Sequence, residues 1–485
     1  RGGDHLQRGI GVLIVSSIVQ RARLTTAVGA ARIATAGIKV LKRGGGTAAP
    51  GAVALRIDPL MVSKITSTMP RGVVIVAGTN GKTTTSRLLA SILSESGFRV
   101  AHNRSGSNLV RGVAAALAQQ TSLRGGCDAD IAVIEADEAA MPEIARLTQP
   151  RMIVLTNLFR DQLDRYGELN AIASKWEPVL KHLEPEAVVV ANADDPRIVD
   201  IVDGTPAVTW YFGVEPGVNA LQELPHAADR ALCTSCGADL RYEVLTLSHL
   251  GAWFCPKCGR KRPEPDVLAT DVRLHGVDSV HLTLRVRNHE SMPLSVSVPG
   301  LYTVYNSAAA ATAALAIGVE PPTIARATES FQTPFGRLEE FTIDGRRVTL
   351  ALVKNPVAFN ETLRMIAGRA GDLRLPTLIA INDLDADGRD VSWLWDVDFE
   401  MLADGTEPVA TTGIRAADMA NRLKYAGVET GRIRLLSPDL EDGLHSFVGS
   451  LGAGGQGFVL ATYTAMLGLR KVIVDGGFAR DYWEE

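Results

Sequence analysis

A Gly-rich turn between an apolar run and a helical run constrains this 485-residue chain more than any other feature. The β-branched run Val73–Val76 predicts a buried parallel strand, and Ser86–Leu93 predicts the helix that follows it. The turn between them, Gly78–Gly81, leads into Lys82 and Thr83. Such a strand–loop–helix unit directs backbone N–H groups and a helix N-terminus at one point, which suits a polyphosphate.

This turn predicts a site for ATP and Mg²⁺. Lys82 would neutralise the β- and γ-phosphates, and the Thr83 hydroxyl would face the metal ion. The strict P-loop pattern requires a Gly where Val76 stands, and a Gly-Lys-Thr triplet can occur by chance in an ordinary turn; the flanking strand and helix favour the phosphate loop. The predicted nucleotide-contacting residues in the loop are Gly78, Thr79, Asn80, Gly81, Lys82, Thr83 and Thr84.

Composition limits the class of protein. A chain of this length with 46% hydrophobic residues can form two or three domains, and its net charge of −4 argues against general nucleic-acid binding. No apolar run approaches the length that crosses a bilayer; Ile10–Val19 is about half of it. Four of the five cysteines form two CxxC pairs, which together with an ATP loop favours a reducing, cytoplasmic protein over a secreted one with a signal peptide in residues 1–30.

The first 50 residues are basic, with Asp4 as the lone acid, and Leu24 to Leu41 has helical apolar spacing. Two interpretations stay open. The segment is either a basic amphipathic helix that lies on anionic lipid, or a helix that packs against its own domain.

Strand-like runs alternate with helical runs from about residue 70 to 230, which predicts a doubly wound parallel sheet with ligands at the carboxyl ends of its strands. Polar residues follow three of these strands at Glu135–Glu138, Thr156–Asn157 and Asn192–Asp195. Carboxylates there suit Mg²⁺, and Glu135 is the predicted ligand beside Thr83. The alternative for Glu135 is a solvated loop charge.

The two CxxC pairs have the spacing of a tetrahedral zinc ribbon. The predicted Zn²⁺ ligands are Cys233, Cys236, Cys255 and Cys258. Because a structural zinc ion has four protein ligands, no catalytic role is expected, and a stabilising insertion is favoured over a nucleic-acid-binding module. Cys127 is interpreted as an ordinary loop thiol.

A second strand–helix alternation begins near residue 345, and it contains the acidic loop Asn382–Asp390 followed by Trp393–Glu400. The loop lacks the final Glu and the flanking helices of an EF-hand, so Ca²⁺ binding is not expected. The predicted domains are a basic helical segment (1–50), a central ATP-binding domain (51–320) with a zinc-ribbon insertion at about 230–263, and a C-terminal domain (321–485).

The order of these motifs resembles the Mur ligase family. Gly78–Thr83 is similar to its ATP loop and Glu135 to its Mg²⁺ acid, while Thr156–Tyr166 and Asn192–Pro196 match its strand ends. Two further residues match nucleotide-contacting positions of the family, Asn306 on the adenine side and Arg337 at the domain junction.

More narrowly, the Cys₄ insertion and the segment Ala386–Glu400 resemble the MurT branch of this family. That resemblance implies an α/β fold: a Mur ligase-like central P-loop ATPase domain with a Cys₄ zinc-ribbon insertion, and a C-terminal Rossmann-like α/β domain. It also implies a ligase of peptidoglycan biosynthesis that uses ATP, Mg²⁺ and Zn²⁺. The implied reaction amidates the D-Glu α-carboxylate in the lipid II stem peptide to D-isoglutamine through an acyl phosphate, at the inner face of the membrane.

The chain departs from ordinary Mur ligases at three places. Gln162 stands where they have His, Lys175 is an imperfectly spaced counterpart of their carbamylated Lys, and Leu352–Pro356 lacks their acid. These departures argue against a second Mg²⁺ and against a standard amino-acid acceptor site.

The implied ammonia must come from a partner, a GatD-type glutaminase. Glutaminases of this type use a Cys nucleophile with a His, and here four cysteines are assigned to zinc while Cys127 lacks the Gly-x-Cys-x-Gly setting. Asp396, beside Trp393 and Trp395, is predicted to orient the partner's His as a triad acid does. Asp390 and Asp398 are the next candidates. The alternative is that Asp396 caps a local turn.

Two other functions stay open at this stage. One is a plain Mur-type ligase that adds an amino acid to a cell-wall precursor. The other is a zinc-ribbon scaffold or nucleic-acid-binding protein with a degenerate ATP site.

Overall fold

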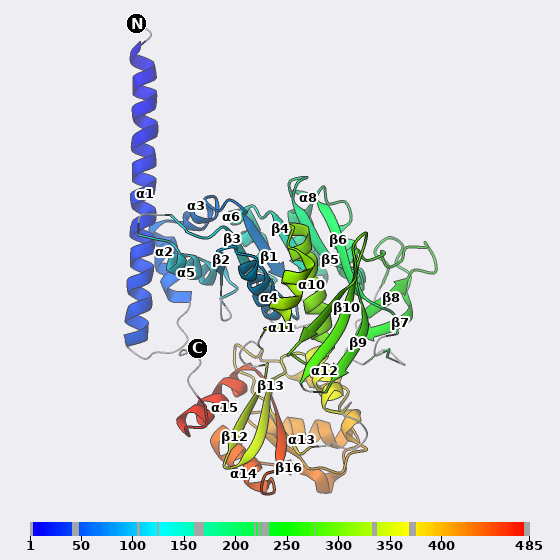
Figure 1. Cartoon of the computed structure of the whole chain (residues 1–485). Coiled ribbons are helices and arrows are strands. Elements are labelled where there is room, and N and C mark those ends of the chain that lie inside the picture. The colour runs from blue at the N-terminus through cyan, green and yellow to red at the C-terminus, as the bar shows by residue number, and fades with distance from the viewer. Residues whose placement is uncertain are drawn as a thin grey trace.

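The computed structural model describes residues 3–40, 48–103, 107–123, 126–159, 169–217, 220–221, 225, 232–276, 278–331, 337–367 and 375–479. Gln162 and the rest of the segment 160–168 lie outside these ranges. Two large sheets, each covered by helices, organise the described chain, and a long N-terminal helix stands beside the first (Figure 1).

The first sheet has nine strands in the order β11-β10-β9-β6-β5-β4-β1-β3-β2. Strands β1 to β6 run parallel, as predicted, and the pairs β9–β10 and β10–β11 are antiparallel. Every residue of β1, β3 and β4 is buried because helices cover both faces of the parallel part. The strands are β1 (Val73–Ala77), β2 (Val100–His102), β3 (Ile131–Glu135), β4 (Met152–Leu155), β5 (Val188–Asn192), β6 (Val208–Val214), β9 (Val267–His275), β10 (Ser279–Val286) and β11 (Met292–Val296).

Successive side chains of β1 enter two different cores, since side chains alternate across a strand. Val74 and Val76 pack with α4, α10 and α11, whereas Val73, Ile75 and Ala77 pack with α1, α5, α6 and α8. Helix α10 begins at Leu301, and its buried alanines let it lie close to the sheet. The helices around this sheet are α2 (Ala48–Ile57), α3 (Met61–Thr66), α4 (Lys82–Glu95), α5 (Val110–Gln120), α6 (Met141–Thr148), α8 (Leu169–Lys181), α9 (Pro196–Val202), α10 (Leu301–Ile317) and α11 (Pro321–Glu329).

Helix α1 (Gly3–Val40) packs through its second half on the first domain. Leu24 and Val28 are buried against α2 and α5. Arg32 donates to the carbonyls of Ala118 and Thr121 at 3.2 and 2.7 Å, so it caps the end of α5. The described side chains therefore support packing against the chain's own domain, and no described helix is long and apolar enough to cross a membrane.

A separate two-stranded hairpin, β7 (Arg241–Leu247) and β8 (Leu250–Phe254), interrupts the first sheet between β6 and β9. The two CxxC pairs flank it, one before β7 and one after β8. The predicted insertion is thus a hairpin joined to a cysteine cluster.

The second sheet has the order β12-β13-β17-β14-β15-β16 and is parallel except for the edge strand β12. This is the predicted Rossmann-like α/β fold. Its strands are β12 (Arg337–Ile343), β13 (Arg346–Leu352), β14 (Thr377–Ala380), β15 (Val409–Thr412), β16 (Ile433–Leu435) and β17 (Gln456–Ala461). Its helices are α12 (Pro356–Ala367), α13 (Ala416–Tyr425), α14 (Leu440–Ser450), α15 (Tyr463–Asp475) and the short 3₁₀ turns η1 (Ser392–Asp396), η2 (Phe399–Leu402) and η3 (Thr430–Arg432).

Helix α11 belongs with the first sheet. Ile324, Ala327 and Phe331 are buried in the core beneath α4 and β11. On this packing we propose that the central domain runs to Phe331, beyond the boundary expected at residue 320.

Candidate active site

The phosphate loop lies between β1 and α4, and two of its glycines are required by their neighbours. Gly78 has φ 142° and Gly81 has φ 86°. A Cβ on Gly78 would lie 2.0 Å from Thr156 Oγ1, and one on Gly81 would lie 2.0 Å from Asn306 Oδ1. Neither contact is possible, so only glycine lets β4 and α10 approach the loop this closely.

The end of β4 holds the loop in shape through Asn80. Thr156 Oγ1 and Asn157 Nδ2 donate to the Asn80 carbonyl at 2.9 and 3.0 Å. The Asn80 N–H in turn donates to Asn157 Oδ1 at 2.8 Å. The end of β4 therefore lies against the phosphate loop that follows β1, as expected for the carboxyl ends of neighbouring parallel strands.

Lys82 folds back inside the curve of the loop. Its Nζ donates to the carbonyls of Gly78 and Thr79 and forms a 3.0 Å ion pair with Glu138 Oε1. Lys82 and Glu138 are only 6% and 3% exposed. Sequence reasoning grouped Glu138 with the acids after β3 but did not identify it as the partner of Lys82.

Glu135 is suited to hold a divalent cation beside this loop. It ends β3, in register with Val76 on β1, and is 4% exposed. The Asn103 side chain fixes its backbone, donating to Glu135 O at 2.8 Å and accepting from Glu135 N at 2.8 Å. Within the described residues the Glu135 carboxylate accepts no hydrogen bond, so its oxygens are available as Mg²⁺ ligands.

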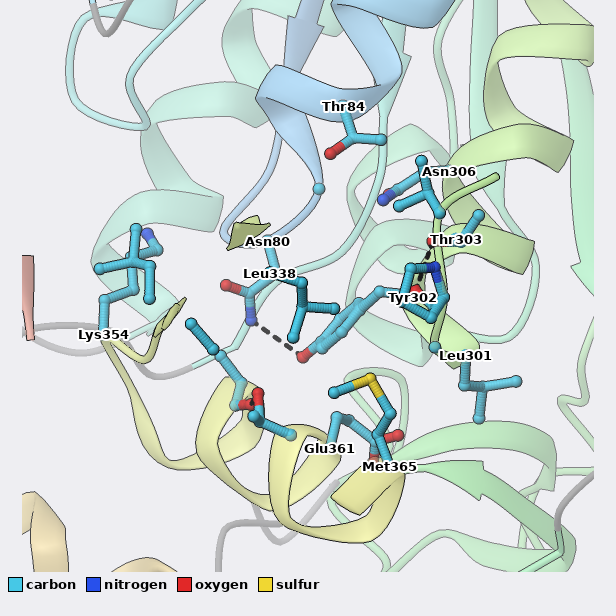
Figure 2. A pocket seen from close by; sticks show the side chains of 18 residues that line it. Asn80, Thr84, Leu301, Tyr302, Thr303, Asn306, Leu338, Lys354, Glu361 and Met365 are labelled. Carbon is cyan, nitrogen blue, oxygen red and sulfur yellow. Dashed lines mark hydrogen bonds between the residues drawn. The ribbon is translucent and has the colours of Figure 1, made fainter. Parts of the chain in front are cut away.

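A cavity of about 150 Å³ lies between the phosphate loop, the start of α10 and helix α12. Asn80 Nδ2 donates to the Tyr302 hydroxyl at 3.1 Å across it (Figure 2). Thr84 and Asn306 line the cavity from the first domain, and Leu338 and Glu361 line it from the second. The predicted loop and Asn306 therefore face the same space.

Residues of the second domain also contact the phosphate loop directly. Asn355 Nδ2 donates to Asn80 Oδ1 at 3.0 Å, and Lys354 Nζ donates to Thr79 O at 3.4 Å. Both residues lie in Leu352–Pro356, the segment that contains no acidic residue. Sequence reasoning missed the contact because the two segments are far apart along the chain.

Glu361 is a nearly buried carboxyl group in the wall of the cavity. Its side chain is 10% exposed and forms an ion pair with Arg364 one turn along α12. Burial raises the pKa of Glu361 to about 7, although Arg364 opposes the shift; the charge of Asp398 adds to it. The group therefore titrates near neutral pH.

Arg337 and Lys175 lie in two different elements, β12 and α8. Arg337 begins β12, next to the cavity-lining Leu338. Lys175 is exposed on α8, while its neighbour Trp176 is buried and donates to the Glu138 carbonyl at 2.8 Å. Helix α8 thus braces Glu138 through Trp176 and turns Lys175 to the surface.

The four predicted zinc ligands converge. The Sγ atoms of Cys233, Cys236, Cys255 and Cys258 all lie within 4.8 Å of one another. The Cys233–Cys258 and Cys236–Cys255 pairs are each 3.5 Å apart. Four thiolates at Zn–S distances of about 2.3 Å would be separated by about 3.8 Å, so this cluster fits a tetrahedral zinc ion.

The three candidate acids near η1 differ in their surroundings. Asp390 accepts from the Ser392 N–H at 2.8 Å and so caps a local turn, which was the alternative considered for Asp396. Asp398 accepts from Asn360 Nδ2 at 2.7 Å. Asp396 is half-buried and follows Trp395, whose side chain is 52% exposed.

The exposed rings of Trp395 and Tyr425 form an aromatic face beside Asp396, and the buried Arg422 packs against it. The rings of Trp395 and Tyr425 are 5.6 Å apart, and the Arg422 guanidinium lies 5.5 Å from the Trp395 ring centre. Tyr425 is 70% exposed. Exposed aromatic side chains stacked on an arginine are typical of the centre of a protein–protein interface.

Comparison with known proteins agrees with this architecture. The family profile of the Mur ligase middle domain matches residues 76–241, and that of the MurT ligase C-terminal domain matches residues 352–466. Among solved structures, a pseudomurein peptide ligase type C from Methanothermus fervidus superimposes with a TM-score of 0.67 at 19% identity, covering 86% of this chain and 80% of that one. MurF from Thermotoga maritima, in complex with ADP, gives a TM-score of 0.61 at 15% identity, covering 86% and 83%.

At the level of sequence the similarity is closer. The chain is 33% identical over 445 residues to the Streptococcus pneumoniae protein described as "Lipid II isoglutaminyl synthase (glutamine-hydrolyzing) subunit MurT". The match covers 91% of this chain and 95% of that protein. The chain therefore belongs to the Mur ligases, in the family of MurT subunits of lipid II isoglutaminyl synthase.

Proposed function

We propose that this chain is the synthetase subunit of a glutamine-dependent lipid II amidating enzyme. It uses ATP to convert the D-Glu α-carboxylate of the stem peptide to the amide of D-isoglutamine. The observation that carries this proposal is the junction at Asn80, where a MurT-type second domain contacts the phosphate loop of a Mur ligase-type first domain.

In the first step a carboxylate oxygen of the acceptor attacks the γ-phosphorus of ATP, and the bond from that phosphorus to the bridging oxygen breaks to release ADP. In the second step ammonia attacks the acyl carbon, phosphate leaves with the former carboxylate oxygen, and the surplus proton passes to solvent. The protein contributes mainly position and charge neutralisation to such a reaction. A Mg²⁺ ion held by Thr83 and Glu135 would neutralise the phosphate oxygens when bound.

The protein groups have separate roles in this proposal. Backbone N–H groups of Gly78 and Gly81 bind the phosphates, and Lys82 stabilises charge on the γ-phosphate. The N–H groups of Thr79 and Asn80 donate to Asn157 and hold the loop in shape. Thr84, Asn306 and Arg337 contact the nucleoside side. The test is ADP release with lipid II as acceptor. ADP should be released when ammonia is supplied. Release of ADP with an amino acid in place of ammonia would instead indicate a plain amino-acid ligase.

We further place the ribose hydroxyls of the nucleotide at Glu361, because this carboxyl group lines the cavity next to the phosphate loop. An ionised carboxylate accepts two hydroxyl hydrogen bonds, whereas the protonated group accepts fewer. Nucleotide binding then favours the ionised form. Its affinity should therefore rise as the pH increases through about 7, the pKa of Glu361 in the free protein.

A Glu361→Gln variant should lose this pH dependence, because its amide does not titrate. The measurement is the affinity for ADP between pH 6 and 8, expressed as the ratio of wild type to variant so that titration of the nucleotide cancels. Glu441→Gln, on the surface helix α14, is the matched control. An unchanged pH profile in Glu361→Gln would remove Glu361 from the nucleotide site.

The ammonia is proposed to come from a separate GatD-type glutaminase, for which the exposed aromatic face of Trp395 and Tyr425 is the docking surface. The relative from Streptococcus pneumoniae is itself named a subunit. Asp396, beside this face, would orient the partner's catalytic His. Lipid II is the membrane-attached acceptor in this proposal, and the enzyme therefore acts at the inner face of the membrane. The same hypothesis includes a peripheral membrane contact through α1.

We predict one Zn²⁺ per chain, bound by Cys233, Cys236, Cys255 and Cys258. Elemental analysis of protein purified without chelator measures this directly. Changing both Cys233 and Cys236 to Ser should abolish zinc binding, because a tetrahedral structural site needs all four thiolates. The Cys127→Ser variant is the control and should retain full zinc content. A zinc-free wild type would contradict the assignment.

A further inference from the structure

The insertion that carries the cysteine cluster is attached to the loop that follows β5. Trp253 Nε1 donates to the Ala193 carbonyl at 3.0 Å, and Gly251 N donates to the Asp194 carbonyl at 3.1 Å. Arg262, which follows the second CxxC pair, donates through Nε to Asp194 Oδ1 at 2.7 Å. Trp253 is 2% exposed, so the insertion is a packed part of the domain.

Asp194 is the meeting point of these contacts. It is fully buried, and its Oδ2 accepts from the Val214 N–H at 3.0 Å and from the Tyr305 hydroxyl at 2.8 Å. One carboxylate thus joins the end of the insertion to β6 and to α10. A buried carboxylate needs such partners; burial raises the pKa of Asp194, and Arg262 and Tyr305 oppose that shift.

Tyr305 connects Asp194 to the nucleotide site because the next residue on α10 is Asn306. Asn306 Oδ1 accepts from Thr85 Oγ1 at 3.3 Å and lies directly against Gly81 of the phosphate loop. A shift of this turn of α10 would move Asn306 relative to the loop and the cavity.

The loop that follows β5 also supports the end of β4. Asn192 Nδ2 donates to the Thr156 carbonyl at 2.9 Å, and the Leu158 N–H donates to Asp195 Oδ2 at 2.8 Å. Thr156 and its neighbour Asn157 are the residues that hold Asn80 in the phosphate loop. The insertion therefore has two hydrogen-bonded connections to the phosphate loop. One runs through α10, and the other runs through the end of β4.

His249 adds a third connection. It lies in the turn between β7 and β8, is 1% exposed, and packs its ring against Phe159 with centroids 4.9 Å apart. Its Nε2 is 3.5 Å from Asp195 Oδ1. The Phe159 N–H donates to Thr79 Oγ1 at 3.0 Å, so the ring supports a residue that contacts the phosphate loop.

We propose that the zinc-ribbon insertion braces the ATP site, and that Asp194 is the positioning residue through which Arg262 and Tyr305 transmit this support. This inference rests on the proposed function of the loop as the ATP site. The cysteine cluster then acts at a distance: by fixing the ends of the β7–β8 hairpin, it fixes the loop after β5, which fixes Asn306 and Asn80. Zinc takes no part in the chemistry.

Tyr305→Phe tests this proposal with the smallest change, since it removes one hydroxyl and keeps the packed ring. The measurements on the full chain are the equilibrium affinity for ADP and the zinc content. ADP should bind about tenfold more weakly, because a hydrogen bond to a buried carboxylate is lost, while zinc remains bound. Tyr463→Phe, on the second domain, is the matched control and should bind ADP as wild type does.

Removal of zinc by a chelator is the second test of this proposal. Amide hydrogen exchange should quicken first in the insertion and then at residues 156–158 and 78–81, and the ADP affinity should fall. Unchanged ADP affinity in both Tyr305→Phe and the zinc-free protein would overturn the brace. If the wild type itself failed to bind ADP, the proposed ATP site would be wrong instead, so the two failures are distinguishable.

Discussion

Replacing Lys82 with Ala is expected to abolish ATP turnover, with a loss of about a thousandfold or more, because the ammonium group that stabilises charge on the transferred phosphoryl group is gone. The measurement is ADP release in the presence of lipid II and ammonia. The structure adds a second consequence: Lys82 faces the buried Glu138 carboxylate at 3.0 Å. Removing one member of a buried ion pair destabilises a protein by about 3–5 kcal/mol, so thermal stability should fall as well.

Lys82→Arg separates these two effects. It keeps a positive charge opposite Glu138, but the planar guanidinium cannot occupy the position of Nζ between the carbonyls of Gly78 and Thr79. Its melting temperature should exceed that of Lys82→Ala while turnover stays strongly reduced. Near-normal turnover in either variant would contradict the assignment of the phosphate loop.

The second large effect is expected from Asp396→Asn. With the partner glutaminase present, glutamine-dependent amidation should fall by a factor on the order of 10⁴, as when the acid of a catalytic triad becomes an amide. With free ammonia the same variant should amidate lipid II at the wild-type rate, because the site around Lys82 and Glu135 is unchanged. The measurement is the rate of amide formation with each nitrogen source.

Asp390→Asn is the matched control for this experiment, since Asp390 caps the neighbouring turn through the Ser392 N–H. It should retain most of its activity with glutamine. Loss of both activities in Asp396→Asn would indicate a folding or synthetase defect, and retention of both would remove Asp396 from the mechanism.

The sequence predicted the parts of the site that are local in the chain. The phosphate loop could be recognised because its strand, glycines and helix are contiguous, and Gly78 and Gly81 do adopt the positive φ angles that require glycine. The cysteine cluster was equally predictable, since two CxxC pairs define the four ligands by spacing alone.

The contacts between the domains could not be predicted in this way. Asn355 and Glu361 lie more than 250 residues from the phosphate loop, and nothing in their local pattern indicates that α12 forms a wall of the cavity. The partner of Lys82 was also missed, because several acids follow β3 and only the structure distinguishes Glu138 from Glu135. Which of these acids faces Lys82 depends on how the helices and strands pack together, and the local sequence does not reveal that packing.

The N-terminal segment illustrates a different limit. Its basic residues fitted a lipid-facing helix and a packed helix equally well, because both have apolar residues at helical spacing. In the structure Arg23 donates to the Ile57 carbonyl at 2.7 Å, and Arg32 caps α5. Charge alone therefore did not reveal that these side chains are used inside the domain.

The fate of a single oxygen atom shows whether the acceptor carboxylate attacks ATP. Lipid II labelled with oxygen-18 in the D-Glu α-carboxylate is incubated with the chain, its glutaminase partner, glutamine and ATP. We expect D-isoglutamine in the product and one labelled oxygen in each inorganic phosphate released, because the carboxylate attacks the γ-phosphorus. Amide formation with unlabelled phosphate, or ADP release without any amide, would contradict it.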